Sequence, residues 1–275
     1  MSAVVNTNLA SLNAQRNLSM SQSSLNTSIQ RLSSGLRVNS AKDDAAGLAI
    51  AERMNAQIKG MNVAIRNAND AISLSQTAEG ALGKVGDSLQ RMRELAVQAA
   101  NDTSGTSDKA NLDAEYQQLA SEVTRVLTGT KFNGTDLLST AATLNFQVGA
   151  NNVATDQIGV DTTDLTGGAG VTAVVGGDLT STANAQTAMD DLDTAIDEIT
   201  TARATFGAVQ NRFDSVISNL QVAAENQTAS RSRIMDTDFA AETANMTRGQ
   251  ILQQAGTAML AQANSLPNTV LKLLQ

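Results

Sequence analysis

The sequence predicts a mainly α-helical protein, an elongated antiparallel helical bundle or coiled coil with paired terminal helices and a small β-hairpin region. Apolar residues recur at spacings of three and four over long stretches of the 275-residue chain. Aromatic residues make up only 2% of the chain, which suits slender helix packing better than a thick globular core. Pro267 is the only proline, so the long apolar stripes before it contain no residue that breaks helices.

The clearest helical seam lies in the carboxyl-terminal half of the chain. Its apolar residues repeat with heptad spacing: Leu192, Ala195, Ile199, Ala202, Phe206, Val209, Phe213, Val216, Leu220 and Ala223. This pattern predicts a long helix over residues 182–230. Such a helix needs partner helices to cover its apolar stripe.

Two further stripes supply these partners. The first predicts a helix over residues 41–100 and consists of Met54, Ile58, Met61, Ile65, Ala68, Ile72, Leu82, Leu89, Met92 and Leu95. Ser40 and Asp43 resemble a capping box at its start, after a break that begins at Gly35. The second stripe, from Leu112 to Val126, predicts a helix over residues 107–128 that folds back on the first. We expect these helices to form an outer domain over residues 41–231.

A change to period-two spacing predicts a β-hairpin within the segment 140–180. Leu144, Phe146 and Val148 alternate with polar residues before a turn at residues 149–152, and Ile158 and Val160 alternate after it. The glycine-rich stretch that follows is read as flexible, and the apolar run 171–175 favours an additional short strand.

Both chain ends carry helical stripes of their own. These are Leu25, Ile29, Leu32 and Leu36 near the amino end, and Leu252, Ala255, Met259, Ala263 and Leu266 near the other, where we expect Pro267 to stop the helix. We expect residues 1–40 and 232–275 to pair as an inner domain. Because two paired helices bury little surface, we expect them to be disordered in the monomer and ordered only after assembly.

Composition excludes several function classes. The chain holds 27 acidic and 19 basic residues and has a net charge of −8, which argues against a nucleic-acid partner. It has no apolar run long enough for membrane insertion, and its first residues lack the features of a cleaved signal peptide. It has no Cys and no His, and no catalytic motif is present, so we expect no enzyme, no metal site and no cofactor.

Several segments of the chain resemble the bacterial flagellins. The segment Gln30–Leu48 is similar to their amino-terminal signature, and further similarity lies in Gln90–Gln98, Phe132–Gly134, Phe146–Asn151 and the closing Val270–Leu274. The variable outer domains that many flagellins insert around residues 160–180 are missing here. The resemblance is therefore to a short, two-layer flagellin.

This resemblance implies a structural subunit that self-assembles into the extracellular flagellar filament for swimming motility. It implies export by the flagellar type III system without a cleaved signal peptide. The implied partners are further copies of the chain, an export chaperone, the filament cap and hook-junction proteins. A hook–filament junction protein, or a secreted coiled-coil adhesin or effector, remains the alternative.

The resemblance also points to residues with roles in recognition and assembly. Arg91, Leu95 and Glu115 match positions read by the host Toll-like receptor for flagellin. Arg91 and Leu95 lie one helical turn apart, which predicts a positive fork beside an exposed leucine, with subunit packing as the main role of both.

Two further groups of residues match family positions. Val270, Leu271, Leu273 and Leu274 match the terminal apolar cluster that serves assembly and is read by cytosolic inflammasome sensors. Phe146, Gly149 and Asn151 lie in the expected hairpin. That hairpin is either a bistable switch between two subunit packings or a plain cover for the end of the bundle.

Overall fold

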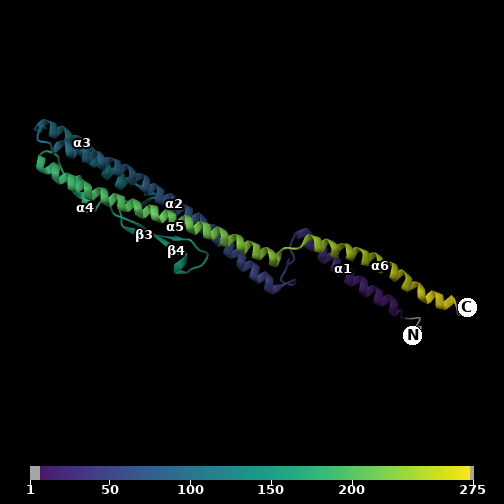
Figure 1. Cartoon of the computed structure of the whole chain (residues 1–275). Helices are drawn as coiled ribbons and strands as arrows, with labels where there is room; N and C mark the ends of the chain where they lie inside the picture. Colours follow the sequence, from purple (N-terminus) through teal and green to yellow (C-terminus); the bar gives the residue numbers. More distant parts are fainter. Residues whose placement is uncertain (1–6, 273–275) are drawn as a thin grey trace. The chain divides into compact units, whose positions relative to one another are not determined.

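The computed structural model describes the backbone of residues 7–272 and the side chains of residues 7–265. It confirms the mainly helical fold class (Figure 1). The helices are α1 (Leu9–Ser34), α2 (Ala45–Ala99), α3 (Thr106–Gly129), α4 (Ala169–Gly176), α5 (Thr182–Met235) and α6 (Phe239–Lys272), with the 3-10 turn η1 (Ala154–Asp156). The antiparallel strand pairs are β1 (Lys131–Phe132) with β2 (Thr135–Asp136), and β3 (Ala142–Gln147) with β4 (Gln157–Thr162).

The chain divides into two compact units. The bundle unit is Gln57–Glu225, and the terminal unit is Met1–Ala56 together with Asn226–Gln275. Both boundaries fall inside the long helices α2 and α5, so each of these helices contributes to both units. The inner and outer layers expected for these parts in a filament stay predictions.

The core of the bundle unit lies between α2, α3 and α5, which run side by side (Figure 1). The predicted seam of α5 is buried at Leu192, Ile199, Phe206 and Phe213 and half-buried at Leu220. The facing helix α2 buries the predicted Leu82, Leu89, Met92 and Leu95. Heptad spacing in the sequence therefore identified much of the core of both helices, although Ala223 at the end of the predicted seam is exposed.

Side-chain contacts show the register between α2 and α5. Arg93 Nε donates to Asp193 Oδ1 at 2.6 Å, and Gln210 Nε2 donates to Glu79 Oε2 at 2.9 Å. In this antiparallel register Phe213 lies alongside a stretch of α2 with small buried residues, including Ala71 and Ser75, and Phe206 lies near Ala78 and Leu82. Large residues on one helix and small ones on the other let the two helices pack without voids.

Polar contacts of α3 hold the connection between α4 and α5. Tyr116 is fully buried, and its hydroxyl donates to the Val174 carbonyl at 3.0 Å. The Asp113 carboxylate accepts from the Leu179 backbone N–H at 2.8 Å. The Val174 carbonyl also accepts from the Gly177 backbone N–H at 3.3 Å at the end of α4, while Asp113 supplies the acceptor for the N–H of the buried Leu179.

The short strand expected over residues 171–175 is wrong, because these residues form α4. The Glu198 carboxylate of α5 accepts from the backbone N–H groups of Gly170 at 3.1 Å and Val171 at 3.4 Å. A carboxylate at a helix amino end satisfies free N–H groups and interacts favourably with the helix dipole. Helical spacing also buries Val171 and Val174 on one face, which outweighs the β propensity of the run.

In the terminal unit α1 and α6 lie antiparallel, which confirms the predicted pairing of the two ends (Figure 1). A Cβ on Gly249 would lie 3.3 Å from Leu25 Cβ, and a Cβ on Gly256 would lie 3.1 Å from Leu18 Cδ1. Gly249 and Gly256, one heptad apart on α6, thus pack against Leu25 and Leu18, one heptad apart on α1. The absence of side chains at these glycines lets the helices approach closely.

The predicted stripe of α6 is on the wrong face for this pairing. The positions turned toward α1 are Met246, Gly249, Gln253, Gly256, Leu260 and Ala263. Among the stripe positions whose side chains the structure describes, Ala263 alone belongs to this set, while Leu252 is 50% exposed and Met259 is 64% exposed. The side chain of Leu266, the last position of the predicted stripe, lies outside the described residues. Close packing at glycine outweighs the number of apolar residues in selecting the contact face.

The break between α1 and α2 begins at Gly35 as predicted, with φ of 72° in the left-handed region that ends many helices. The start of α2 differs from the prediction. Ser40 and Asp43 form a turn before the helix, and Asp44 is the cap, since its Oδ1 accepts from the Gly47 N–H at 2.8 Å. The sequence offered two adjacent carboxylates, and the turn uses the first of them.

The predicted stop at Pro267 is also wrong, because α6 continues to Lys272. A proline inside a helix leaves the carbonyl four residues earlier without its usual donor. Here that carbonyl belongs to Ala263, and it accepts from the side-chain amide of Asn8 at 2.8 Å. The replacement donor lies at the opposite end of the sequence.

Truncating the seam of α5 is expected to destabilise the bundle strongly. Phe206→Ala removes a side chain that is 1% exposed, and we expect a loss of about 3–5 kcal/mol in the free energy of unfolding. The matched variant Leu220→Ala at a half-buried seam position should cost about 1 kcal/mol. Denaturant unfolding of the monomer, followed by circular dichroism, measures both. Equal losses would contradict the assigned core.

Tyr116, the only tyrosine, reports on the fold at alkaline pH. Burial, and then the charges of Asp191, Asp113 and Asp178, raise its pKa well above the usual 10.0. A folded-state pKa above the unfolded value means that this contribution to stability is complete below about pH 10 and declines above it. We therefore expect phenolate absorbance to rise together with loss of helical circular dichroism. Phenolate formation near pH 10 with the helices intact would show that Tyr116 is not buried.

Candidate functional site

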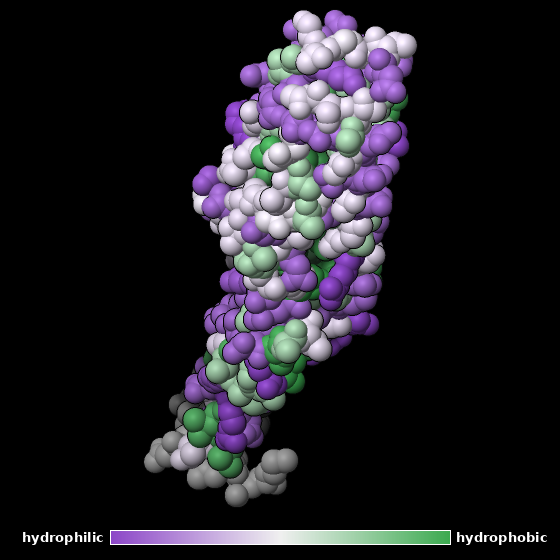
Figure 2. Space-filling view, turned by 90° about the vertical axis from the view of Figure 1, so that its left-hand side faces the viewer, coloured by the Kyte–Doolittle hydropathy of each residue, from purple (hydrophilic) through white to green (hydrophobic). Residues whose placement is uncertain are grey.

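The terminal unit exposes large apolar side chains on both of its paired helices. On α1 they are Leu9, Leu12, Met20 and Ile29, and on α6 they are Phe239, Ile251, Leu252 and Met259. Figure 2 shows apolar residues at the surface next to the grey terminal atoms. Leu252 and Met259 are one heptad apart, on a face of α6 that α1 does not cover. Exposed apolar surface of this kind is typical of protein–protein contact sites.

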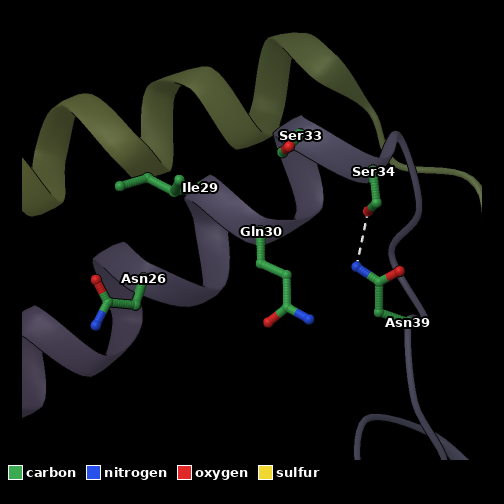
Figure 3. A pocket seen from close by; sticks show the side chains of 6 residues that line it. All are labelled: Asn26, Ile29, Gln30, Ser33, Ser34 and Asn39. Carbon is green, nitrogen blue, oxygen red and sulfur yellow. Dashed lines mark hydrogen bonds between the residues drawn. The ribbon is translucent and has the colours of Figure 1, made fainter.

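Shallow grooves follow the outer face of α1. One has a volume of about 490 Å³ and is lined by Asn26, Ile29, Gln30, Ser33, Ser34 and Asn39, with Asn39 Nδ2 donating to Ser34 Oγ at 2.7 Å (Figure 3). A second, of about 520 Å³, begins at Gln15 and shares Asn26 with the first. No charged residue lines either groove. A contact here would therefore avoid the cost of removing charges from water.

The residues matched to receptor recognition join α2 to α3. Arg91 contacts Glu115 at 2.9 Å and Glu94 at 2.8 Å, and these two carboxylates raise the pKa of Arg91 further above its usual value. Leu95 is 1% exposed, so the expected exposed leucine is wrong. It lies in the buried row of α2 beside Met92. The exposed part of this site is the ion pair of Arg91 and Glu115.

The predicted hairpin is formed by β3 and β4 and is docked on α2 and α5. Phe146 packs edge-to-face against Phe213 with ring centroids 5.9 Å apart. Asn67 Nδ2 of α2 donates to the Gln147 carbonyl at 2.9 Å. A Cβ on Gly60 would lie 2.7 Å from the Ala150 methyl group, so this glycine makes room for the hairpin loop.

Within the loop, Asn151 is exposed, and its backbone N–H donates to Asp156 Oδ2 at 2.9 Å. The same carboxylate occupies the space that a side chain on Gly149 would need. Gly60, Asn67 and Asp156 hold the hairpin and its loop in place but belong to no predicted site. Gly60 is one of five glycines in α2, and open space surrounds three of the others, so the sequence did not single it out. Nothing in the sequence linked Asn67 or Asp156 to the hairpin either.

The terminal apolar cluster is only partly within the described residues. Val270 and Leu271 lie in the last part of α6, where the backbone alone is described, and Leu273 and Leu274 lie outside the described residues. Their predicted role in assembly stays a prediction.

Neither a membrane span nor a metal cluster is found in the part of the chain that the structure describes. No helix there is long and apolar enough to cross a membrane. No group of three or more Asp and Glu residues there is placed to hold a metal ion.

Comparison with known proteins identifies the family. The model of the bacterial flagellin N-terminal helical region matches residues 5–143, and that of the C-terminal helical region matches residues 189–274. The chain belongs to the bacterial flagellin family. Flagellins are structural proteins that polymerise into the flagellar filament, so this chain is an extracellular filament subunit and not a member of an enzyme family.

Full-length relatives and solved structures agree with this assignment. A flagellin of Halalkalibacterium halodurans is 47% identical over 99% of this chain and 100% of its own length. A crystal structure of Bacillus cereus flagellin is 36% identical, covers 60% of this chain and 94% of its own, and has a TM-score of 0.51. A putative flagellar hook-associated protein of Vibrio parahaemolyticus is 12% identical, covers 70% of this chain and 100% of its own, and with a TM-score of 0.59 shows the shared fold alone.

Adding one methyl group at Gly149 is expected to destabilise the hairpin. Gly149→Ala places a Cβ against the Asp156 carboxylate, so we expect a loss of about 1–3 kcal/mol in the free energy of unfolding. Gly86→Ala is the matched control, because open space surrounds that position in α2 and alanine should stabilise the helix by about 0.5–1 kcal/mol. Thermal unfolding of both variants tests the opposite signs. A neutral Gly149→Ala would show that the loop is not packed as described.

Proposed function

We propose that the outer faces of α1 and α6 are the main contacts between copies of this chain in a filament that drives swimming motility. The observation that supports this most directly is the set of exposed apolar side chains on both helices, including Ile29, Leu252 and Met259. They lie outside the glycine–leucine contact that pairs the two helices. A neighbouring copy is the natural cover for them in a family that polymerises.

The energetics favour order that depends on assembly. Complete burial of a leucine or methionine side chain stabilises by about 1.5–3 kcal/mol. In an isolated helix pair the outward-facing side chains stay in water and do not contribute this free energy. In a filament, neighbouring copies bury them and the contribution is gained. Contacts between different patches of identical subunits extend into a helical polymer when the rotation between neighbouring copies does not close into a ring.

The same arrangement suits export and delivery. We propose that the monomer passes through the flagellar type III system, because a terminal unit with few large side chains in its helix contact would unfold readily for passage through a narrow channel. An export chaperone, the filament cap and hook-junction proteins are the proposed partners along this route. The exposed apolar positions of α6 are the natural contact for a chaperone, since they need cover before assembly.

Host recognition is proposed for two sites. The ion pair of Arg91 and Glu115 offers exposed charge on the bundle unit to a Toll-like receptor, while Leu95 supports the site from within the core. The cluster Val270, Leu271, Leu273 and Leu274 is the proposed contact for an inflammasome sensor, as in the sequence-based prediction.

A charge on the outer face of α6 is expected to stop filament growth. In Leu252→Asp a carboxylate would have to be buried at the contact between copies, so growth on filament seeds should be lost. Leu252→Met keeps an apolar side chain of similar volume and should grow normally. Electron microscopy of seeded samples gives the filament length, and circular dichroism of the monomer checks the bundle unit.

Two results with these Leu252 variants would contradict the proposed contact. Normal filaments from Leu252→Asp would remove the outer face of α6 from the contact between copies. Loss of growth in Leu252→Met as well would show that shape, and not apolar character, decides the contact at this position.

A further inference from the structure

The proline in α6 leaves a defined gap in the hydrogen bonds of that helix. In a continuous helix the Ala263 carbonyl would accept from the backbone N–H of residue 267, but proline has no backbone N–H. The helix nevertheless continues to Lys272. Something must therefore replace the missing donor at Ala263 or leave a carbonyl unpaired in a helix contact.

The side chain of Asn8 provides that donor. Its Nδ2 donates to the Ala263 carbonyl at 2.8 Å. Its Oδ1 accepts from the Ser11 backbone N–H at 3.1 Å, which caps the amino end of α1. One amide group thus satisfies an acceptor of α6 and a donor of α1 at once, using both of its polar atoms.

A neighbouring contact holds the same two segments in place. Ser11 Oγ donates to Asn264 Oδ1 at 2.8 Å, and Ser11 and Ala263 are both buried. At the other end of the helix pair, Leu36 and Asp236 form an antiparallel bridge, and the Arg37 guanidinium donates to the Ile234 carbonyl at 2.7 Å. The pair is thus held by polar contacts at both ends, and the contact at Asn8 is the one that compensates for proline.

We propose that Asn8 is a positioning residue that couples the start of α1 to the continuation of α6 beyond Pro267. The last turns of α6 then keep their helical direction only when the amino end is capped and paired beside them. The inference rests on the proposed function, because assembly is the event that brings both ends into order. It assigns to Asn8 a role that a simple helix cap does not have.

The coupling can be tested with a cycle of substitutions. Asn8→Ser keeps a good cap for α1 but is too short to reach Ala263, so only the donor to α6 is lost. Pro267→Ala restores the backbone N–H and makes that donor unnecessary. We expect Asn8→Ser to raise the critical concentration for assembly on the order of tenfold in the natural chain, the size expected for one lost hydrogen bond to a buried acceptor. In the Pro267→Ala background we expect less than about a threefold effect, since the gap is closed.

Asn8→Ala is the control that separates the two roles of the residue. It removes both the cap and the donor, so part of its effect should remain in the Pro267→Ala background. Hydrogen exchange of amides 268–272 in the filaments gives a second readout, with faster exchange expected for Asn8→Ser in the natural chain and normal exchange in the double variant. A merely structural defect at Asn8 would not be rescued by a change at residue 267.

The outcomes keep this inference separate from the proposed function. An equal effect of Asn8→Ser in both backgrounds, or no effect in the natural chain, would overturn the coupling while leaving filament assembly intact. If the natural protein formed no filaments, the proposed function would fail. The same variants compared by hydrogen exchange in a stabilising osmolyte would then still show whether Pro267→Ala removes the effect of Asn8→Ser.

Discussion

The heptad packing of α2 against α5 is the interaction on which the other elements of the bundle unit depend. Phe206 and Phe213 are buried in one cluster with the apolar stripe of α2, and residues of α3 and of the hairpin pack against the same cluster. Phe213 also packs edge-to-face against Phe146 of the hairpin, so one residue of the seam contacts both the helices and the strands. The exposed ion pairs, such as Arg93 with Asp193, are compatible with the register that this packing sets but contribute little to stability.

The two helices of the terminal unit pack at glycines and not through a seam of large side chains. Its helices meet where Gly249 and Gly256 receive Leu25 and Leu18, so the contact is close but contains few large side chains. Little apolar area is buried for each ordered residue, and conformational entropy opposes the pairing. Because several large apolar residues of both helices, such as Ile29, Leu252 and Met259, are exposed, the stability of the unit depends on what covers them.

Much of this fold follows from periodicity in the sequence, and the exceptions have physical reasons. Spacings of three and four located the long helices and the buried seam, since burial of a stripe needs no knowledge of its partner. The contact face of α6 was predicted wrongly because a search for large apolar residues selects Leu252 and Met259 and passes over the glycines that contact α1. Helix α4 depends on the carboxylate of Glu198, and the continuation past Pro267 depends on Asn8, and both partners are remote in sequence. Of the candidate site, period-two spacing predicted the hairpin and family resemblance pointed to Arg91 and Glu115, but neither predicted the ion pair between these two residues or the burial of Leu95.

The distribution of charge explains why the two units suit different roles. In the bundle unit, ion pairs such as Arg91 with Glu115 lie at the surface, where water and salt screen them and where they keep the surface soluble. On the outer face of α1 the grooves are lined by amides, hydroxyls and aliphatic groups. Uncharged polar groups can be buried against a neighbour if they find hydrogen-bond partners there, and each such pairing favours one alignment of the two copies. Apolar side chains on these helices can therefore supply the drive for association while the amides select its geometry.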